Sequence, residues 1–218
     1  MKLYTHWSFS PQKVRFALQE LGLGVDEVFV DLLQGEQKSP EFTAVNPMQK
    51  VPALEDDGFV LWESNAILAY FGEREDRLWP QDVRQRADAL RWMFFETRYL
   101  ADSVGPLWFF ECAAPLRGLP VGDRLPDGTL LAERIAKARL DLDHPLSVAS
   151  DHLARHRWIL GDGFSLADCS LGTTLAALAS TGFDLTSYPG VVAYVDRVRG
   201  RDAWGTLDSL TPAASRPR

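Results

Sequence analysis

Cysteine is scarce in this chain, and long apolar runs are absent. The 218 residues include two cysteines, Cys112 and Cys169, which lie far apart and form no Cys-X-X-Cys motif. Two lone thiols predict no redox or metal motif and fit a reducing cytoplasm, so each is expected to be a small buried apolar residue. No apolar run approaches the ~20 residues of a membrane span, and Met1 leads straight into strand-like sequence. We therefore predict no signal peptide and no membrane partner.

The charge of the chain excludes a further class of partner. A net charge of −7 argues against nucleic acid or an anionic membrane as the main partner. The length suits two domains, and 46% hydrophobic residues allow a substantial core. We predict domains at residues 1–80 and 81–218, the first of them acidic, with 7 basic and 13 acidic residues.

The first domain opens with a strand, a helix and a second strand. Residues 2–5 and 27–32 alternate in polarity, and residues 14–21 repeat at helical spacing. Ser10 is expected to cap this helix and Pro11 to be its first residue. A strand–helix–strand order indicates a parallel βαβ unit.

The stretch from Asn46 to Phe71 organises the rest of this domain. Pro52 forbids a helix through its segment, and Asp56-Asp57-Gly58 between two short apolar runs is a hairpin signal. Helical spacing resumes at Ser64. A proline loop, a hairpin and a helix start therefore expose backbone donors and acceptors together, as capture of a small peptide requires. The element order predicts a thioredoxin-like α/β domain.

From residue 82 the pattern becomes helical. Helices are expected at residues 82–112 with a kink at Gly105-Pro106, at 130–155 with a bend at Pro145, at 165–180 and at 191–199, with a loop at 115–128 and a frayed tail after 210. The segment 165–180 is apolar nearly all round and should be the buried central helix. Its start, Ser165 to Asp168, is a capping box that concerns folding, and we assign Asp168 no catalysis.

Val51-Pro52, followed at this distance by Glu63-Ser64 and an apolar helix, closely resembles the glutathione-binding half of the glutathione transferase family. The resemblance covers the whole chain. It implies a thioredoxin-like glutathione-binding domain, an all-α C-terminal domain with a hydrophobic substrate pocket, and a cytoplasmic, bacterial-like homodimer that acts in detoxification. Glutathione is the implied co-substrate, and no metal is implied.

Ser8 resembles the active serine of the serine-type classes (theta, phi, zeta), because Lys13-Val14 follows it at the same distance. Glutathione must react as a thiolate. A hydroxyl donating to sulfur is worth about 1.5–3 kcal/mol, which lowers the thiol pKa by roughly one to two units. Ser10 competes for this role, although it is interpreted chiefly as a helix cap. Serine at both positions disfavours thiol–disulfide chemistry that needs a protein thiol there.

The resemblance also implies the glutathione-binding residues. Pro52 is expected to follow a cis peptide bond, with Val51 offering its N–H and C=O to the cysteinyl backbone. Ser64 and the free N–H groups of its helix suit the γ-glutamyl carboxylate, and Glu63 suits the ammonium.

Three further polar residues are candidates for the glycyl end of glutathione. Gln37 and Lys38 lie in a segment similar to one of the phi class, whose polar residues meet the glycyl carboxylate. Lys50 is similar to a theta-class lysine that precedes the Val-Pro step. A solvated surface position is the competing interpretation for both lysines.

The second substrate is expected to be small, apolar and electrophilic. Trp7 and Phe9 flank Ser8, and Trp108 is the residue we select from the aromatic helix, although a core role competes for each. We predict a glutathione transferase. The alternatives are a maleylacetoacetate isomerase-like enzyme, from whose Ser-Ser-Cys motif Ser8-Phe9-Ser10 departs, a dehalogenase or ether-cleaving relative, and a non-catalytic glutathione- or partner-binding protein.

Overall fold

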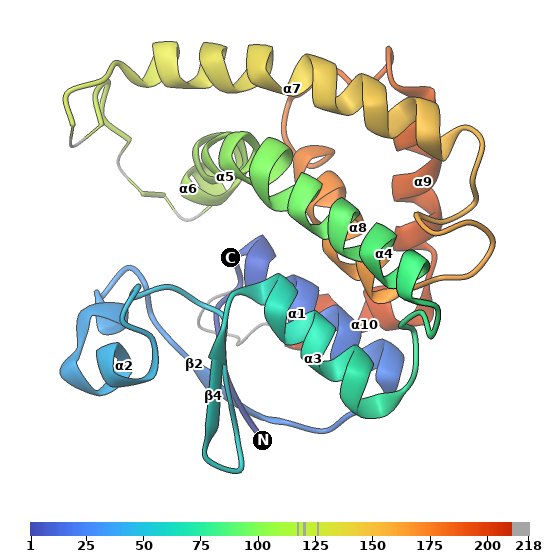
Figure 1. Ribbon diagram of the computed structural model, residues 1–218. Helices are drawn as coiled ribbons and strands as arrows, with labels where there is room; N and C mark the ends of the chain where they lie inside the picture. The colour runs from blue at the N-terminus through green and yellow to red at the C-terminus, as the bar shows by residue number, and fades with distance from the viewer. Residues whose placement is uncertain (117, 120, 126, 211–218) are drawn as a thin grey trace. The chain divides into compact units, whose positions relative to one another are not determined.

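The computed structural model describes residues 1–210 except 117, 120 and 126. The chain separates into two compact units, and the boundary falls inside a helix, between Arg86 and Ala87. Residues 1–86 and the segment from Arg201 form the first unit, and residues 87–200 belong to the second (Figure 1). The tail after residue 210, which was expected to fray, lies outside the described residues.

A four-stranded mixed sheet with the order β2-β1-β3-β4 forms the centre of the first unit. Its strands are β1 (Lys2–Thr5), β2 (Asp26–Phe29), β3 (Ala53–Asp56) and β4 (Phe59–Trp62). Strand β1 pairs in parallel with β2 and antiparallel with β3, which pairs antiparallel with β4. The predicted βαβ unit and hairpin are confirmed, although β2 ends three residues before the expected boundary.

The hairpin between β3 and β4 turns on two residues with positive φ. Asp57 has φ 51° and Gly58 has φ 84°. Two successive positive-φ residues define the type I′ turn, whose twist matches that of the flanking strands. This explains why Asp-Gly was a sufficient sequence signal for the hairpin.

Helices cover both sides of this sheet. They are α1 (Phe9–Leu21), the 3₁₀ helix η1 (Glu36–Lys38), α2 (Pro40–Val45), α3 (Ser64–Glu75) and α10 (Asp202–Leu210). Figure 1 shows α1 and α3 together on one side of the strands and α2 on the other. The sequence did not predict α10. Its Trp204 packs edge-on against Phe16 of α1, with 5.3 Å between ring centroids, and Arg201 pairs with Glu20.

The predicted start of α1 is wrong by two residues. Ser8 occupies the N-cap position with extended backbone (φ −67°, ψ 159°), and the helix begins at Phe9. Ser10 and Pro11 therefore lie inside the first turn, and Ser10 is not the cap. Proline fits here because the first N–H groups of a helix have no partner within it.

The second unit is all-helical within the described residues, as predicted. Its elements are α4 (Val83–Phe95), the π-helical segments η2 (Glu96–Ala101) and η3 (Phe109–Ala113), α5 (Asp102–Trp108), α6 (Ala114–Leu116), α7 (Leu131–Leu153), α8 (Leu166–Leu178) and α9 (Pro189–Arg199). Pro106 and Pro145 lie inside α5 and α7. The expected loop at 115–128 contains residues 117, 120 and 126, which are outside the described chain. None of the described helices combines the length and apolarity needed to cross a membrane.

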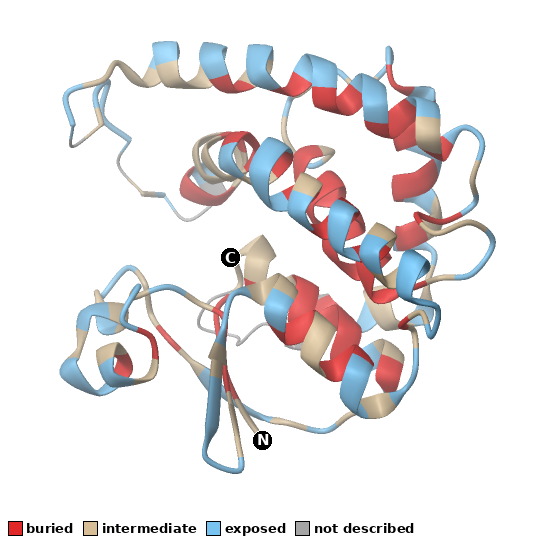
Figure 2. Ribbon diagram, viewed as in Figure 1, coloured by how far each residue is buried: buried red, intermediate tan, exposed pale blue. Residues whose placement is uncertain are grey.

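Helix α8 is the centre of the second unit. All of its 13 residues are buried, and Figure 2 shows it in the colour of buried residues. The predicted capping box is confirmed: the Asp168 carboxylate accepts the N–H of Ser165 at 2.8 Å and also the Ser165 hydroxyl at 2.8 Å. From η2, the buried carboxylate of Glu96 accepts the Thr174 hydroxyl of α8 at 2.6 Å.

Candidate functional site

Three segments named from the sequence meet at one edge of the sheet. Tyr4, near the end of β1, pairs with Ala53 at the start of β3, and Ala53 pairs with Trp62 at the end of β4. The chain that leaves β1, the chain that enters β3 and the chain that leaves β4 therefore share this edge. These segments carry Ser8, Val51-Pro52 and Glu63-Ser64, respectively.

Ser8 is held by its backbone, which leaves its hydroxyl available. Its N–H donates to Nδ1 of His6 at 3.3 Å, and its carbonyl accepts the N–H of Gln12 at 3.4 Å. Within the described first turn of α1, the Ser8 side chain makes no capping hydrogen bond. The hydroxyl is thus a free donor beside the positive end of a 13-residue helix. Ser10, by contrast, is the second residue of that helix.

The bond between Val51 and Pro52 is cis, as the resemblance implied. Val51 lies outside β3, which starts at Ala53, so its main-chain groups are not part of the sheet ladder. The buried Asn46 braces this loop: its Nδ2 donates to the Lys50 carbonyl at 2.6 Å, and its Oδ1 accepts the Met48 N–H at 2.9 Å. Sequence reasoning did not single out Asn46, although Asn-Pro is a turn signal.

Glu63 and Ser64 form the N-terminus of α3. Glu63 is the N-cap residue and has φ 75° and ψ 113°. Residues other than glycine rarely adopt this backbone conformation, and residues that do cluster at functional sites. The Glu63 side chain makes no capping hydrogen bond within the described residues, and the first turn of α3 carries no acidic residue. The first N–H groups of α3 and the Ser64 hydroxyl therefore offer donors to an anion.

The remaining polar candidates lie in η1 and in the loop before Pro52, both in the first unit. Gln37 is in η1, and its side-chain oxygen is buried with no hydrogen-bond partner in the described chain. Lys38 and Lys50 are exposed. A buried side-chain oxygen without a donor is costly, so among these three residues Gln37 has an acceptor left for a ligand N–H.

The aromatic candidates and the cysteines divide between the two units. Trp7 and Phe9 flank Ser8 and are half-buried, whereas Trp108 ends α5 in the second unit. Cys112 and Cys169 form no disulfide within the described residues; Cys169 is buried as expected, while Cys112 is partly exposed. Within the described ranges, no group of three or more His, Cys, Asp or Glu side chains is arranged to hold a metal.

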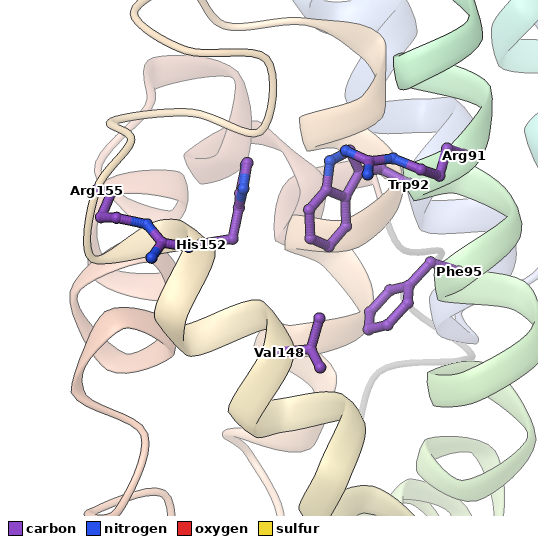
Figure 3. Close-up of a pocket in the computed structure, with 6 residues that line it drawn as sticks. All are labelled: Arg91, Trp92, Phe95, Val148, His152 and Arg155. Carbon is purple, nitrogen blue, oxygen red and sulfur yellow. The ribbon is translucent and has the colours of Figure 1, made fainter.

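The second unit contains a cavity of about 250 Å³ between α4 and the end of α7. Figure 3 shows the residues that line it, which are Arg91, Trp92, Phe95, Val148, His152 and Arg155. The His152 ring lies 4.5 Å from that of Trp92 and 4.3 Å from that of His156, measured between centroids. His152 Nε2 is 2.9 Å from the Ile159 carbonyl oxygen. None of the predicted site residues lines this cavity.

We expect the stability of the chain to fall in acid partly because of His152. Burial lowers the pKa of His152 below its usual 6.5. The unfolded state then binds a proton more readily than the folded state, so the free energy of unfolding decreases as the pH falls below about 6.5. Urea unfolding of His152→Asn at about pH 7.5 and about pH 5.5 should show a weaker pH dependence than wild type.

The matched control for this prediction is His144→Asn, because His144 is exposed on the same helix. It should retain the wild-type pH dependence. An unchanged pH dependence in His152→Asn, or an equal change in both variants, contradicts the prediction.

Two family models match parts of this chain. Residues 1–73 match the model "Glutathione S-transferase, N-terminal domain", and residues 132–197 match "Glutathione S-transferase, C-terminal domain". The chain is 34% identical to glutathione S-transferase 3 of Zea mays over 98% of this chain and 90% of the relative. It is 30% identical to disulfide-bond oxidoreductase YfcG of Escherichia coli over 88% of this chain and 87% of the relative.

A solved structure is similar over nearly the whole chain. It is a glutathione transferase from Burkholderia graminis with two glutathione molecules bound per subunit. It superposes with a TM-score of 0.83 at 27% identity and covers 97% of this chain and 89% of its own.

Proposed function

This chain belongs to the glutathione transferase family, and from that premise we propose that it activates glutathione as a thiolate for attack on an electrophilic, largely apolar second substrate. Ser8 is the proposed thiolate stabiliser. Val51, Pro52, Glu63 and Ser64 are the proposed main contacts of the tripeptide.

The observation that supports this proposal most strongly is the shared sheet edge. The pairing of Tyr4 with Ala53, and of Ala53 with Trp62, brings three segments with unused donors to one place. They are a serine hydroxyl at a helix start, a Val-Pro step outside the ladder, and a helix N-terminus at which the N-cap side chain makes no capping hydrogen bond. A tripeptide with two carboxylates, an ammonium and a thiol needs this set of partners.

In the proposed mechanism, the glutathione thiol loses its proton to solvent, and the Ser8 hydroxyl donates a hydrogen bond to the resulting anion. The partial positive charge at the start of α1 favours the same anion. The sulfur then attacks an electrophilic carbon, a new carbon–sulfur bond forms, and the leaving group departs with the bonding electrons.

The other assignments also stand as proposals. Gln37, Lys38 and Lys50 are proposed to meet the glycyl end of glutathione. The unpartnered side-chain oxygen of Gln37 is an acceptor, so it suits the glycyl N–H and not the carboxylate. Trp7, Phe9 and Trp108 are proposed to contact the second substrate. From its family we also propose that the chain forms a homodimer, is cytoplasmic and acts in detoxification.

Binding and turnover by the Ser64→Ala variant test the proposed function. Wild type should bind immobilised glutathione and conjugate a general aryl halide. A hydrogen bond to a charged group is worth about 1.5–3 kcal/mol, so Ser64→Ala should raise the KM for glutathione at least tenfold or so. The kcat should change little, because the γ-glutamyl end does not react.

Ser147→Ala is the matched control, because Ser147 is exposed on α7 in the second unit. It should keep the wild-type KM. Binding without conjugation across a broad panel of electrophiles indicates the non-catalytic binding protein instead. Failure to bind glutathione refutes the proposal.

A second candidate is reduction of disulfides by glutathione. The specific observation is the 30% identity to disulfide-bond oxidoreductase YfcG. Neither cysteine is near Ser8 in the sequence, so in this candidate two glutathione molecules supply both thiols: one attacks the disulfide, and the second resolves the mixed disulfide to glutathione disulfide. Formation of glutathione disulfide from a small organic disulfide, faster than conjugation of any electrophile, favours this candidate.

A further inference from the structure

The loop that carries Ser8 is fixed by a side chain outside the predicted site. His6 lies two residues before Ser8, and its Nδ1 accepts the Ser8 N–H at 3.3 Å. A ring nitrogen that accepts a hydrogen bond carries no proton, so this imidazole is neutral with its proton on Nε2. The contact from a side chain to the N–H two residues ahead is the pattern by which Asn and Asp organise turns.

The orientation of this ring is set by packing. His6 is only 3% exposed. Its ring stacks on Phe29, the last residue of β2, at a centroid distance of 5.3 Å and an interplanar angle of 25°. It also contacts the Trp7 ring at 4.5 Å. Packing of the His6 ring against Phe29 of β2 and against Trp7 therefore holds Nδ1, the acceptor atom, in place.

A second brace reaches the same loop from β2. The guanidinium of the buried Arg15 forms an ion pair with Glu27 at 3.0 Å and donates to the Gln12 side-chain oxygen at 3.4 Å. The Gln12 amide nitrogen in turn donates to the Trp7 carbonyl at 3.5 Å. The His6 contact is the only one of these side-chain bonds that ends on Ser8 itself.

We propose that His6 is a positioning residue that aims the Ser8 hydroxyl at the sulfur of bound glutathione by accepting the Ser8 N–H. This inference rests on the proposed function of Ser8. Loss of the acceptor frees the Ser8 backbone and weakens the hydrogen bond to the thiolate, while the glutathione contacts at the start of α3 stay intact. The thiol of bound glutathione then titrates at higher pH.

Two substitutions separate the acceptor from the ring. His6→Phe keeps an aromatic ring to stack on Phe29 but has no acceptor. His6→Asn loses the ring but places a carbonyl oxygen where Nδ1 was, so it restores the turn contact. The readouts are the ultraviolet absorbance of the thiolate as a function of pH at saturating glutathione, kcat, KM for each substrate, and the urea midpoint.

We expect His6→Phe to lower kcat about three- to tenfold at neutral pH, the scale of one lost hydrogen bond, and to shift the thiolate titration to higher pH. The KM for glutathione should stay within about twofold of wild type. His6→Asn should restore the titration and most of the kcat even where its urea midpoint is lower. A wild-type titration in His6→Phe, or an equal loss in both variants, overturns the inference. An inactive wild type that binds no glutathione refutes the proposed function itself, and this inference with it.

Discussion

Ser8→Ala is expected to lower kcat/KM for conjugation about 10- to 100-fold at neutral pH. The magnitude follows from one hydrogen bond to a charged acceptor, about 1.5–3 kcal/mol, which raises the pKa of the bound thiol by roughly one to two units when it is lost. The rate should recover as the pH is raised, since the thiolate then forms without the hydroxyl. The measurement is the pH profile of kcat/KM with a general aryl halide, which should move to higher pH.

The Ser8→Ala substitution should change activity without changing stability, which is unusual for a serine at a helix N-cap. Replacing a Ser whose side chain caps a helix costs about 1 kcal/mol of stability, but the Ser8 hydroxyl makes no such bond in the described first turn. The urea midpoint should therefore stay close to that of wild type. Ser10→Ala is the matched control, because Ser10 lies inside the first turn of α1, and it should retain activity. Loss of activity in Ser10→Ala with retention in Ser8→Ala reverses the assignment.

Local signals predicted the sheet and its hairpin. Asp57-Gly58 supplies the two positive-φ positions that a type I′ turn requires. The start of α3 at Ser64 followed from helical spacing. These elements depend on neighbouring residues, so a single sequence contains the information needed to predict them.

Other features depend on contacts that are distant in the sequence. Helix α10 is joined to its unit through Trp204 against Phe16 and Arg201 with Glu20, partners more than 180 residues away.

The candidate site also combines features that the local sequence signals with features that depend on packing. Val51-Pro52 and Glu63-Ser64 were found from their pairing at a particular spacing. The positive φ of Glu63 and the stacking of His6 on Phe29 were not, because neither glutamate nor histidine signals its backbone angle or its partner in the sequence. A sequence motif thus identifies the residues that contact a ligand. The residues that position them are recognised only from the packing in the structure.

Among stability changes, we expect Asp168→Ala to be the most severe, at about 3–5 kcal/mol of unfolding free energy. Asp168 is fully buried at the start of α8. Besides Ser165, its carboxylate accepts the Ile159 N–H at 2.8 Å and the Tyr194 hydroxyl at 3.0 Å. Alanine leaves these donors buried without acceptors, and each such donor costs about 1–3 kcal/mol. Urea unfolding followed by circular dichroism measures the loss.

Tyr194→Phe provides the graded comparison that identifies the cause. Burial and the neighbouring Asp168 carboxylate raise the pKa of Tyr194 well above its usual value, so its hydroxyl remains a donor at all ordinary pH values. Removing this hydroxyl takes away one donor and leaves no buried donor without an acceptor, so it should cost only about 1 kcal/mol of unfolding free energy.

Asp184→Ala is the exposed control. It removes a turn contact to the Thr186 N–H and should cost less still. If Asp168→Ala is no more harmful than Asp184→Ala, the carboxylate is not what joins α8 to α9 and to the turn at Ile159. If the loss is large while binding to immobilised glutathione survives at low temperature, Asp168 acts through folding alone, because the proposed site residues of the first unit do not include it.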